Sequence, residues 1–270
     1  MIKGKLNIPT RLTTNAAPTA GNDSVVNKPK LNIPSRLAPP VPPPPPPPAQ
    51  TQGAYAATPQ PGRPPSIMIA VPAMEMVNAE FAQHLAMAAA NMVANGIRIN
   101  CAFNIGSVIT IARRNLVDIF LQSDFDYIWW VDSDMKFPID APMRLLKRNV
   151  EIVGCNYRRR RFPNANFTGM SGAPGTYTEF VTTDQSPPME LIDVLPHGCV
   201  LVKREVYEKV AQPHYLQDYI PEMNLEIGED IYFCQKAQAA GYKVWCDQEL
   251  SREISHIGIF HFNYNLSVQK

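Results

Sequence analysis

The sequence has few cysteines and no long apolar run, and these two shortages exclude several classes of protein. Its five cysteines are scattered, and no two have the CxxC spacing of a zinc ligand pair. We therefore expect reduced cysteines in a cytoplasmic protein. No apolar stretch reaches the length of a membrane-spanning helix, and the first residues lack the apolar core of a signal peptide. The sequence predicts no membrane span.

Residues 1–65 have almost no aromatic side chains and are instead rich in proline. They contain 17 of the 27 prolines, including the unbroken run 42–48. Such a composition cannot bury enough apolar surface to offset the entropy lost on ordering. We expect a disordered tail with polyproline II character over 1–65 and one domain over 66–270.

The net charge of +1 conceals an uneven distribution. Seven basic residues against one acidic residue give the tail +6, which leaves −5 for residues 66–270. The tail segment 5–12, KLNIPTRL, recurs at 30–37 as KLNIPSRL. Two interpretations stay open: a bivalent docking peptide for a partner, or a duplication without function.

The domain alternates apolar runs of strand length with segments of helical period. We expect strands at 67–72, 97–103, 127–131, 150–155, 191–195, 199–203 and 243–246, and helices at 81–95, 109–121, 139–147, 205–210 and 229–240. Residues 163–188 are typical of a long loop. This order predicts an α/β fold with a mainly parallel sheet and flanking helices. Ligands of such sheets bind at the carboxyl ends of the strands.

Two carboxylates, Asp132 and Asp134, follow the apolar run 127–131 and are separated by Ser133. Two charges at the end of a buried strand need partners. A divalent cation and a diphosphate would supply them, because hard cations are often held by few carboxylates together with substrate phosphates. A solvated turn is the alternative, and the preceding buried run favours binding.

A second acidic pair, Glu229-Asp230, opens a helical pattern that ends at Gly241, and a strand containing His256 and His261 follows. The helix macrodipole alone would favour acids in a first turn. The order of the three motifs is more informative than any of them. In that order they resemble the motifs of GT-A-fold glycosyltransferases, especially family-2-like enzymes of bacteria and their phages, over roughly 66–262.

The resemblance implies a GT-A fold, a nucleotide-diphosphate sugar as donor and Mn²⁺ or Mg²⁺ as cation. Asp132-Ser133-Asp134 resembles the DxD motif, Glu229-Asp230 the ED motif, and His256 the late metal-binding histidine, with His261 as an alternative. Asp134, Asp132 and His256 are then the expected metal site. Asp230 is the expected base, supported by Glu229, in a displacement that inverts configuration.

The resemblance also implies contacts with the donor. The expected residues are Val71, Pro72 and Ala73 around the base, Asp132 and Ser133 at the sugar or ribose, Arg113 (or equally Arg114) near the nucleotide, and His197-Gly198 at the donor sugar and acceptor. The family often reads uracil with an acid where Asn104 stands here. The acceptor stays open among a glycan, a protein and a hydroxylated nucleobase, and the expected location is the cytoplasm of a bacterial or phage-infected cell.

Arg158 begins a run of four arginines that follows the strand expected at 150–155. Arginine suits the bidentate geometry of phosphate, so one or two of them are candidates for binding the donor diphosphate or an anionic acceptor. A solvated charge run is the equal alternative.

Two other functions compete with the glycosyltransferase. A metal-dependent nucleotidyltransferase usually has a glycine-rich basic loop after its first strand, whereas residues 72–76 contain neither glycine nor a basic residue. A non-catalytic carbohydrate-binding or structural protein would be expected to have lost motif carboxylates, and all of them are present.

Overall fold

The computed structural model describes residues 63–161, 165–258, 261 and 263–265. The predicted tail therefore lies outside the described residues except for positions 63–65, and so do both copies of its repeat. Among the described residues, no helix has the length and apolarity needed to cross a bilayer.

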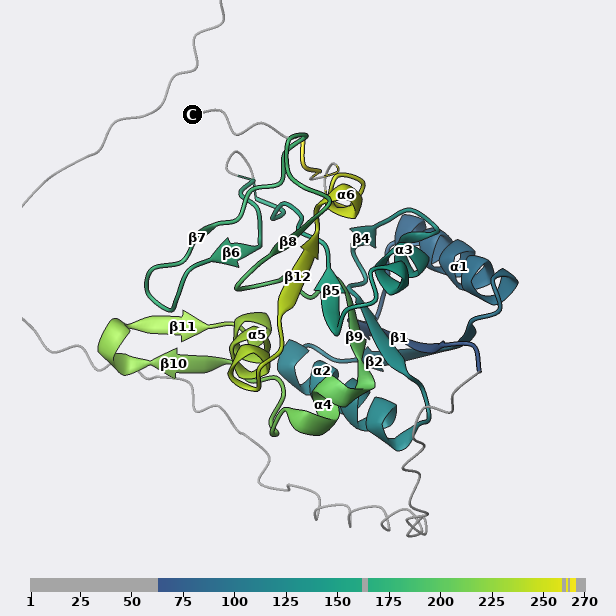
Figure 1. The fold of residues 1–270 in the computed structure, drawn as a ribbon, viewed down its shortest axis with the longest axis horizontal. Coiled ribbons are helices and arrows are strands. Elements are labelled where there is room, and N and C mark those ends of the chain that lie inside the picture. The colour runs from purple at the N-terminus through teal and green to yellow at the C-terminus, as the bar shows by residue number, and fades with distance from the viewer. Residues whose placement is uncertain (1–62, 162–164, 259–260, 262, 266–270) are drawn as a thin grey trace, which may run out of the picture. The chain divides into compact units, whose positions relative to one another are not determined.

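A seven-stranded sheet in the order β2-β1-β3-β9-β5-β12-β8 forms the centre of the domain (Figure 1). Strands β2, β1, β3, β5 and β12 run in one direction, whereas β9 and β8 run in the other. The strands are β1 (Ser66–Ala73), β2 (Arg98–Ile105), β3 (Tyr127–Val131), β5 (Ile152–Gly154), β8 (Met189–Leu191), β9 (Cys199–Lys203) and β12 (Val244–Asp247). The predicted α/β fold with a mainly parallel sheet is confirmed.

Helices cover both faces of this sheet and bury two separate apolar cores. One core contains side chains of α1 (Ala79–Ala94), α3 (Ala141–Lys147) and α6 (Gln248–Ser251). The other contains side chains of α2 (Ile109–Gln122), α4 (Arg204–Lys209) and α5 (Glu229–Ala239). Three small antiparallel pairs complete the described part: β4 (Met135–Lys136) with β13 (Ser255–His256), β6 (Met170–Ser171) with β7 (Thr178–Glu179), and β10 (Asp218–Ile220) with β11 (Leu225–Ile227).

Strand β3, in the interior of the sheet, contributes one tryptophan to each core. Successive side chains of a strand point to opposite faces, so Trp129 packs in the core of α1 and α3 and Trp130 in the core of α2, α4 and α5. Both side chains are fully buried. The Trp130 indole N–H donates to the Tyr207 hydroxyl at 2.8 Å. These contacts fix β3, which is the strand that leads into the paired aspartates.

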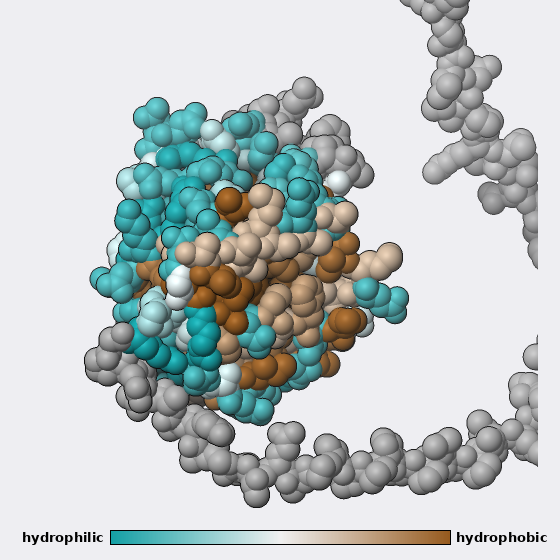
Figure 2. Space-filling view, turned by 90° about the vertical axis from the view of Figure 1, so that its right-hand side faces the viewer, coloured by the Kyte–Doolittle hydropathy of each residue, from teal (hydrophilic) through white to brown (hydrophobic). Residues whose placement is uncertain are grey.

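Helix α1 shows how local sequence sets an element's limits. The Asn78 side chain accepts a hydrogen bond from the Glu80 N–H at 2.8 Å, which caps the first turn. The chain leaves the helix through Gly96 with φ at +78°, a conformation that glycine adopts without strain. Apolar residues gather on the side of the molecule that carries this helix (Figure 2), and its exposed side chains include Met87 and Val93.

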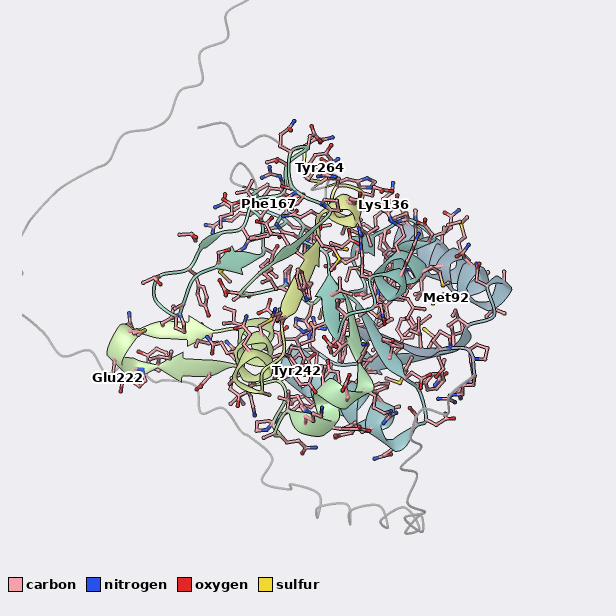
Figure 3. The ribbon with its side chains drawn as sticks, viewed as in Figure 1. Met92, Lys136, Phe167, Glu222, Tyr242 and Tyr264 are labelled. Carbon is pink, nitrogen blue, oxygen red and sulfur yellow. The ribbon has the colours of Figure 1, made fainter. Side chains whose placement is uncertain are left out.

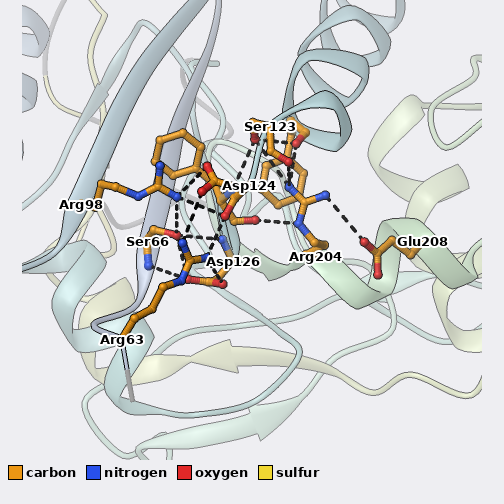
Figure 4. A network of polar contacts seen from close by, with 10 residues as sticks. Arg63, Ser66, Arg98, Ser123, Asp124, Asp126, Arg204 and Glu208 are labelled. Atoms are coloured by element: carbon orange, nitrogen blue, oxygen red, sulfur yellow. Dashed lines mark hydrogen bonds and ion pairs between the residues drawn. The ribbon is translucent and has the colours of Figure 1, made fainter. Parts of the chain in front are cut away.

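The amino ends of the parallel strands are held by a network of arginines and carboxylates (Figure 4). Arg63 donates to Asp126 at 2.8 Å and also contacts Asp124, which binds Arg98 at 2.7 Å. These ion pairs hold Arg63, the first described residue, against the segment that leads into β3. A cavity of about 460 Å³ opens here beside Arg63 and Arg204, at the end of the sheet opposite the paired aspartates.

Several elements differ from the sequence-based expectation. The predicted strand 191–195 is instead β8 at Met189–Leu191, because the following residues leave the sheet and Val194 pairs with Met170. The predicted loop 163–188 contains the pair β6–β7, and the hairpin β10–β11 was not predicted. Four of the cysteines are buried and all five are free, with Cys101 exposed.

Candidate functional site

The paired aspartates lie in the turn between β3 and β4, at the carboxyl end of β3. Strand β4 pairs with β13, so Met135 lies opposite His256 although the two are distant in sequence. The backbone N–H of Ile257 donates to the Asp134 carbonyl at 2.7 Å, and that of Asp132 to the Gly198 carbonyl at 3.2 Å. The small β4–β13 pair therefore brings the late histidine to the DxD turn.

Asp134 and His256 face each other across a short gap. The His256 Nε2 lies 3.3 Å from the Asp134 Oδ1. The other ring nitrogen, Nδ1, is 3.2 Å from the Arg158 carbonyl, to which it donates. In a neutral ring Nε2 then carries a lone pair, so two acceptors face each other, and a proton or a cation between them would resolve this. His261 instead contacts Glu80 at 3.0 Å and does not reach this gap.

The other oxygen of Asp134 is paired with an arginine. Arg160 places its Nη2 at 2.8 Å from the Asp134 Oδ2. Burial acts to raise the pKa of Asp134. With a proton on His256 Nε2, the hydrogen bond and charge of that ring, together with the charge of Arg160, outweigh burial and hold the pKa of Asp134 below its usual value. Asp134 is therefore kept as a carboxylate, the form that a cation needs.

Arg113 joins the two acidic motifs. Its guanidinium donates to Asp132 at 3.0 Å and to Glu229 at 3.1 Å, and the side chain is only 2% exposed. It lies 5.2 Å from the Trp130 ring centroid. The two carboxylates raise the pKa of Arg113 against the opposing effect of burial, while burial raises the pKa of Asp132. Arg113 thus acts within the protein as a fixed link between α2, β3 and α5.

Asp230 occupies the first turn of α5 beside this link. Its Oδ1 accepts a hydrogen bond from the Ile231 N–H at 2.8 Å, which leaves Oδ2 for another partner. A Cβ on Gly228 would come within 3.0 Å of that Oδ1, so the glycine leaves room for the carboxylate. Burial, and then the charge of Glu229, raise the pKa of Asp230 to about 6. A carboxylate with that pKa accepts a proton well near neutral pH.

Tyr157 is a buried member of the site that the sequence reasoning missed. Its hydroxyl accepts the Gly198 N–H at 2.9 Å, and its ring meets the His256 ring edge-on at 5.3 Å. A Cβ on Gly198 would lie 2.4 Å from this hydroxyl, so position 198 requires glycine. Burial and the nearby charges of Asp132 and Asp230 raise the pKa of Tyr157. Its place directly after the strand expected at 150–155 was the only available signal.

His197 lies within the α5 side of the core rather than on an open surface. Its Nδ1 is 3.1 Å from the Leu195 carbonyl, and its ring packs edge-on against Phe233. Burial and the charge of Arg113 lower its pKa well below the usual value. The neutral ring therefore presents a buried Nε2 that has no hydrogen-bond partner among the described residues.

The residues expected around the nucleotide base lie at the carboxyl end of β1, and they are buried. Strand β1 continues one residue beyond Pro72, to Ala73, and Val71, Pro72 and Ala73 are all buried. Asn104 is the in-register neighbour of Pro72 on β2 and is half-buried. Ser133 is half-buried in the DxD turn.

Of the arginine run, the structure places Arg160, and not Arg158, against the site carboxylates. The Arg158 guanidinium donates to the carbonyls of Ala165 and Tyr264 at 2.8 and 3.0 Å and stacks 4.1 Å from the Phe167 ring centroid. Phe167 and Tyr264 are labelled in Figure 3. These contacts hold the segment that follows β5 and position the carbonyl of Arg158 for His256.

The expected metal ligands fit a cation that substrate helps to hold. Among the described residues, no three His, Cys, Asp or Glu side chains are grouped to hold a metal by themselves. Asp134 and His256 converge, whereas the Oδ1 of Asp132 is directed to Arg113. One carboxylate completed by diphosphate oxygens is an ordinary arrangement for Mg²⁺-type cations, and His256 would add one nitrogen ligand to it.

Comparisons with known proteins add a likeness of fold. The structure is similar to a crystal structure of A197 from STIV, with a TM-score of 0.51 and 15% sequence identity over 75% of this chain and 92% of that one. No protein-family model matches the sequence, and a search of curated proteins found no match.

Proposed function

We propose that the protein is a metal-dependent glycosyltransferase that moves a sugar from a nucleotide-diphosphate donor to an acceptor hydroxyl. The observation that carries this proposal is that both acidic motifs and the late histidine meet at the carboxyl end of β3. Arg113 links Asp132 to Glu229, and β4–β13 pairing brings His256 to Asp134. The similarity to A197 from STIV supports the fold alone.

Asp134 and His256 would hold Mn²⁺ or Mg²⁺, and the bound cation supplies positive charge that stabilises the leaving diphosphate. Arg113 keeps Asp132 and Glu229 in fixed positions around the donor. The Tyr157 hydroxyl accepts a hydrogen bond from the Gly198 N–H and so fixes the turn at Gly198.

The Oδ2 atom of Asp230 takes the proton of the acceptor hydroxyl as that oxygen attacks the anomeric carbon. The bond from that carbon to the diphosphate breaks in the same step, so configuration is inverted. The helical first turn orients the carboxylate, and its raised pKa matches it to this proton transfer.

The acceptor class is tested by competition among substrates. A glycan, a protein and an oligonucleotide with a hydroxylated base are offered with the same donor, and the labelled product identifies the class. Before that, a panel of nucleotide sugars is screened for thermal stabilisation with Mn²⁺, because a ligand that binds only the folded state raises the unfolding midpoint.

The cation site is tested with Asp134→Asn. The substitution removes the anionic ligand but leaves a partly exposed turn residue of the same shape, so we expect loss of Mn²⁺-dependent donor binding. The lost ion pairs are partly exposed and contribute about 1 kcal/mol or less, so the unfolding midpoint should fall by no more than about 2–4 °C. Asp118→Asn on the exposed side of α2 is the control and should behave as wild type. Full Mn²⁺-dependent activity in Asp134→Asn would show that the ligand assignment is wrong.

A further inference from the structure

Arg160 differs from the other arginines around the site because its position is weakly fixed. Its side chain is 48% exposed and, among the described residues, makes one ion pair, with Asp134. Arg113 is buried between two carboxylates, and Arg158 is held by two carbonyls and an aromatic ring. Exposed ion pairs contribute little to stability, so Arg160 leaves Asp134 at small cost.

The contact of Arg160 with Asp134 conflicts with a cation at the same carboxylate. A divalent cation between Asp134 and His256 would stand close to the guanidinium, and the two positive charges repel each other. A diphosphate bound to that cation would attract the Arg160 guanidinium, because it offers several negatively charged oxygens that suit the planar fork of arginine.

We propose that Arg160 binds the donor diphosphate and that, in its absence, the same side chain neutralises Asp134. Arg160 then exchanges one anionic partner, Asp134, for another, the diphosphate. The affinity of the site for the cation is therefore higher when the diphosphate is present than when it is absent. This inference rests on the proposed function, since it takes Asp134 as a cation ligand and a nucleoside diphosphate as the leaving group.

This exchange predicts that Arg160→Ala changes two binding constants in opposite directions. In Arg160→Ala the cation no longer competes with a positive side chain, so Mn²⁺ alone should bind about threefold more tightly, as expected for an exposed pair. In saturating Mn²⁺, a nucleoside diphosphate should bind about tenfold more weakly, because a charge-assisted contact is lost. If Arg160 only stabilised the conformation of the segment that follows β5, its removal would change the binding constants of Mn²⁺ and of the nucleoside diphosphate in the same direction.

The experiment measures both constants on the full chain, with free Mn²⁺ followed by electron paramagnetic resonance and nucleoside diphosphate binding by calorimetry. Arg159→Ala is the matched control, because Arg159 is an exposed neighbour whose side chain forms no ion pair with the described residues. Arg160→Lys keeps the charge without the fork and should lie between wild type and Arg160→Ala. All variants should share the wild-type unfolding midpoint.

The outcomes separate this inference from the proposed function. If wild type binds Mn²⁺ neither alone nor with a nucleoside diphosphate, the cation site and with it the proposed function are wrong. If wild type binds both, but Arg160→Ala matches Arg159→Ala or shifts the two constants in the same direction, the role of Arg160 is wrong while the cation site stands.

Discussion

At the scale of single residues, the site depends on carboxylates that look alike in sequence but differ in surroundings. Asp134 is held as an anion by His256 and Arg160, whereas burial raises the pKa of Asp230 to about 6. One environment suits a cation ligand and the other suits a base. The separation of the two roles follows from the neighbours that the fold supplies, since both residues are simply aspartate at the start of a new element.

The division of labour between Asp230 and Glu229 gives the first prediction. Asp230→Asn removes the base, and general base catalysis contributes about 10²- to 10⁴-fold, so kcat should fall by that factor. Donor affinity should stay near wild type, because the Asp134–His256 pair is untouched. Glu229→Gln should reduce kcat less, since Glu229 is paired with Arg113. A dead Glu229→Gln beside an active Asp230→Asn would reverse the two roles.

The same carboxyl group predicts a pH dependence. Its pKa in the folded protein, about 6, lies above the usual value of about 4 for aspartate, so the base is ionised only as the pH rises through about 6. We expect kcat to increase between pH 5 and pH 7 and the rise to disappear in Asp230→Asn. Because folding disfavours the ionised form, the stability contributed by Asp230 is present below pH 4 and is lost as the pH rises.

That linkage provides a second readout for the pH prediction. Asp230→Asn should gain stability relative to wild type at pH 7 and not at pH 4, measured by denaturant unfolding at both values. A kcat profile that is flat from pH 5 to pH 7 in wild type would contradict the assignment of Asp230 as the base.

At the scale of elements, Arg113 holds three of them together through one buried side chain. It reaches from α2 to Asp132 after β3 and to Glu229 in α5. Arg113→Ala leaves two carboxylates without their partner, and breaking such a pair from one side costs about 3 kcal/mol. We expect that loss in denaturant unfolding, together with weaker donor binding.

Arg114→Ala is the matched control for this element-scale prediction. Arg114 is the next residue of α2, is half-buried, and lines a separate cavity of about 320 Å³ with Asp118 and His214. Its removal should change stability and donor binding little. Equal effects of the two substitutions would mean that the link through Arg113 does not organise the site.

The sequence predicted those elements whose apolar pattern is complete within a few residues. Strands β3 and β9 match the predicted ranges 127–131 and 199–203 because each contains a continuous apolar run, bounded by Asp126 and Asp132 in the first case and by Gly198 and Lys203 in the second. The antiparallel insertion of β9 between β3 and β5 was not predictable, because an apolar run contains no information on its direction. The hairpin β10–β11 was missed because its strands have three residues each and alternate only weakly.

In the candidate site, too, the local motifs could be predicted from the sequence and the long-range contacts could not. The motif carboxylates and His256 were chosen as candidates from their order, but the contacts between them in the structure join residues far apart in sequence. Arg113 and Glu229 are separated by 116 positions, and Tyr157 has no motif of its own. The run 158–161 was noticed as a group, yet which arginine turns to the carboxylates depends on the path of the chain after β5.

At the scale of the whole molecule, the described contacts of the domain extend to Arg63, which belongs to the predicted tail by sequence. Arg63 is within the predicted tail, yet it binds Asp124 and Asp126 beside the start of β1 and β3. Residues further towards the amino terminus lie outside the described residues, and their composition contains no core-forming pattern. The network in Figure 4 therefore marks where truncation should begin to affect folding.

Two truncations that differ by five residues test whether Arg63 contributes to the stability of the domain. Removing residues 1–60 keeps Arg63, so turnover on a small soluble acceptor and the unfolding midpoint should equal wild type. Removing residues 1–65 deletes the Arg63 contacts and should lower the midpoint by about 2–4 °C for each kcal/mol lost. Because Arg63 lies at the end of the sheet opposite Asp134, the donor-binding constant should change in neither truncation.

The shorter deletion also tests the function of the tail. A collapse of turnover on the small acceptor in this deletion would show that the tail contributes to the site. A loss of turnover confined to a macromolecular acceptor would support docking through the repeated KLNIP segments.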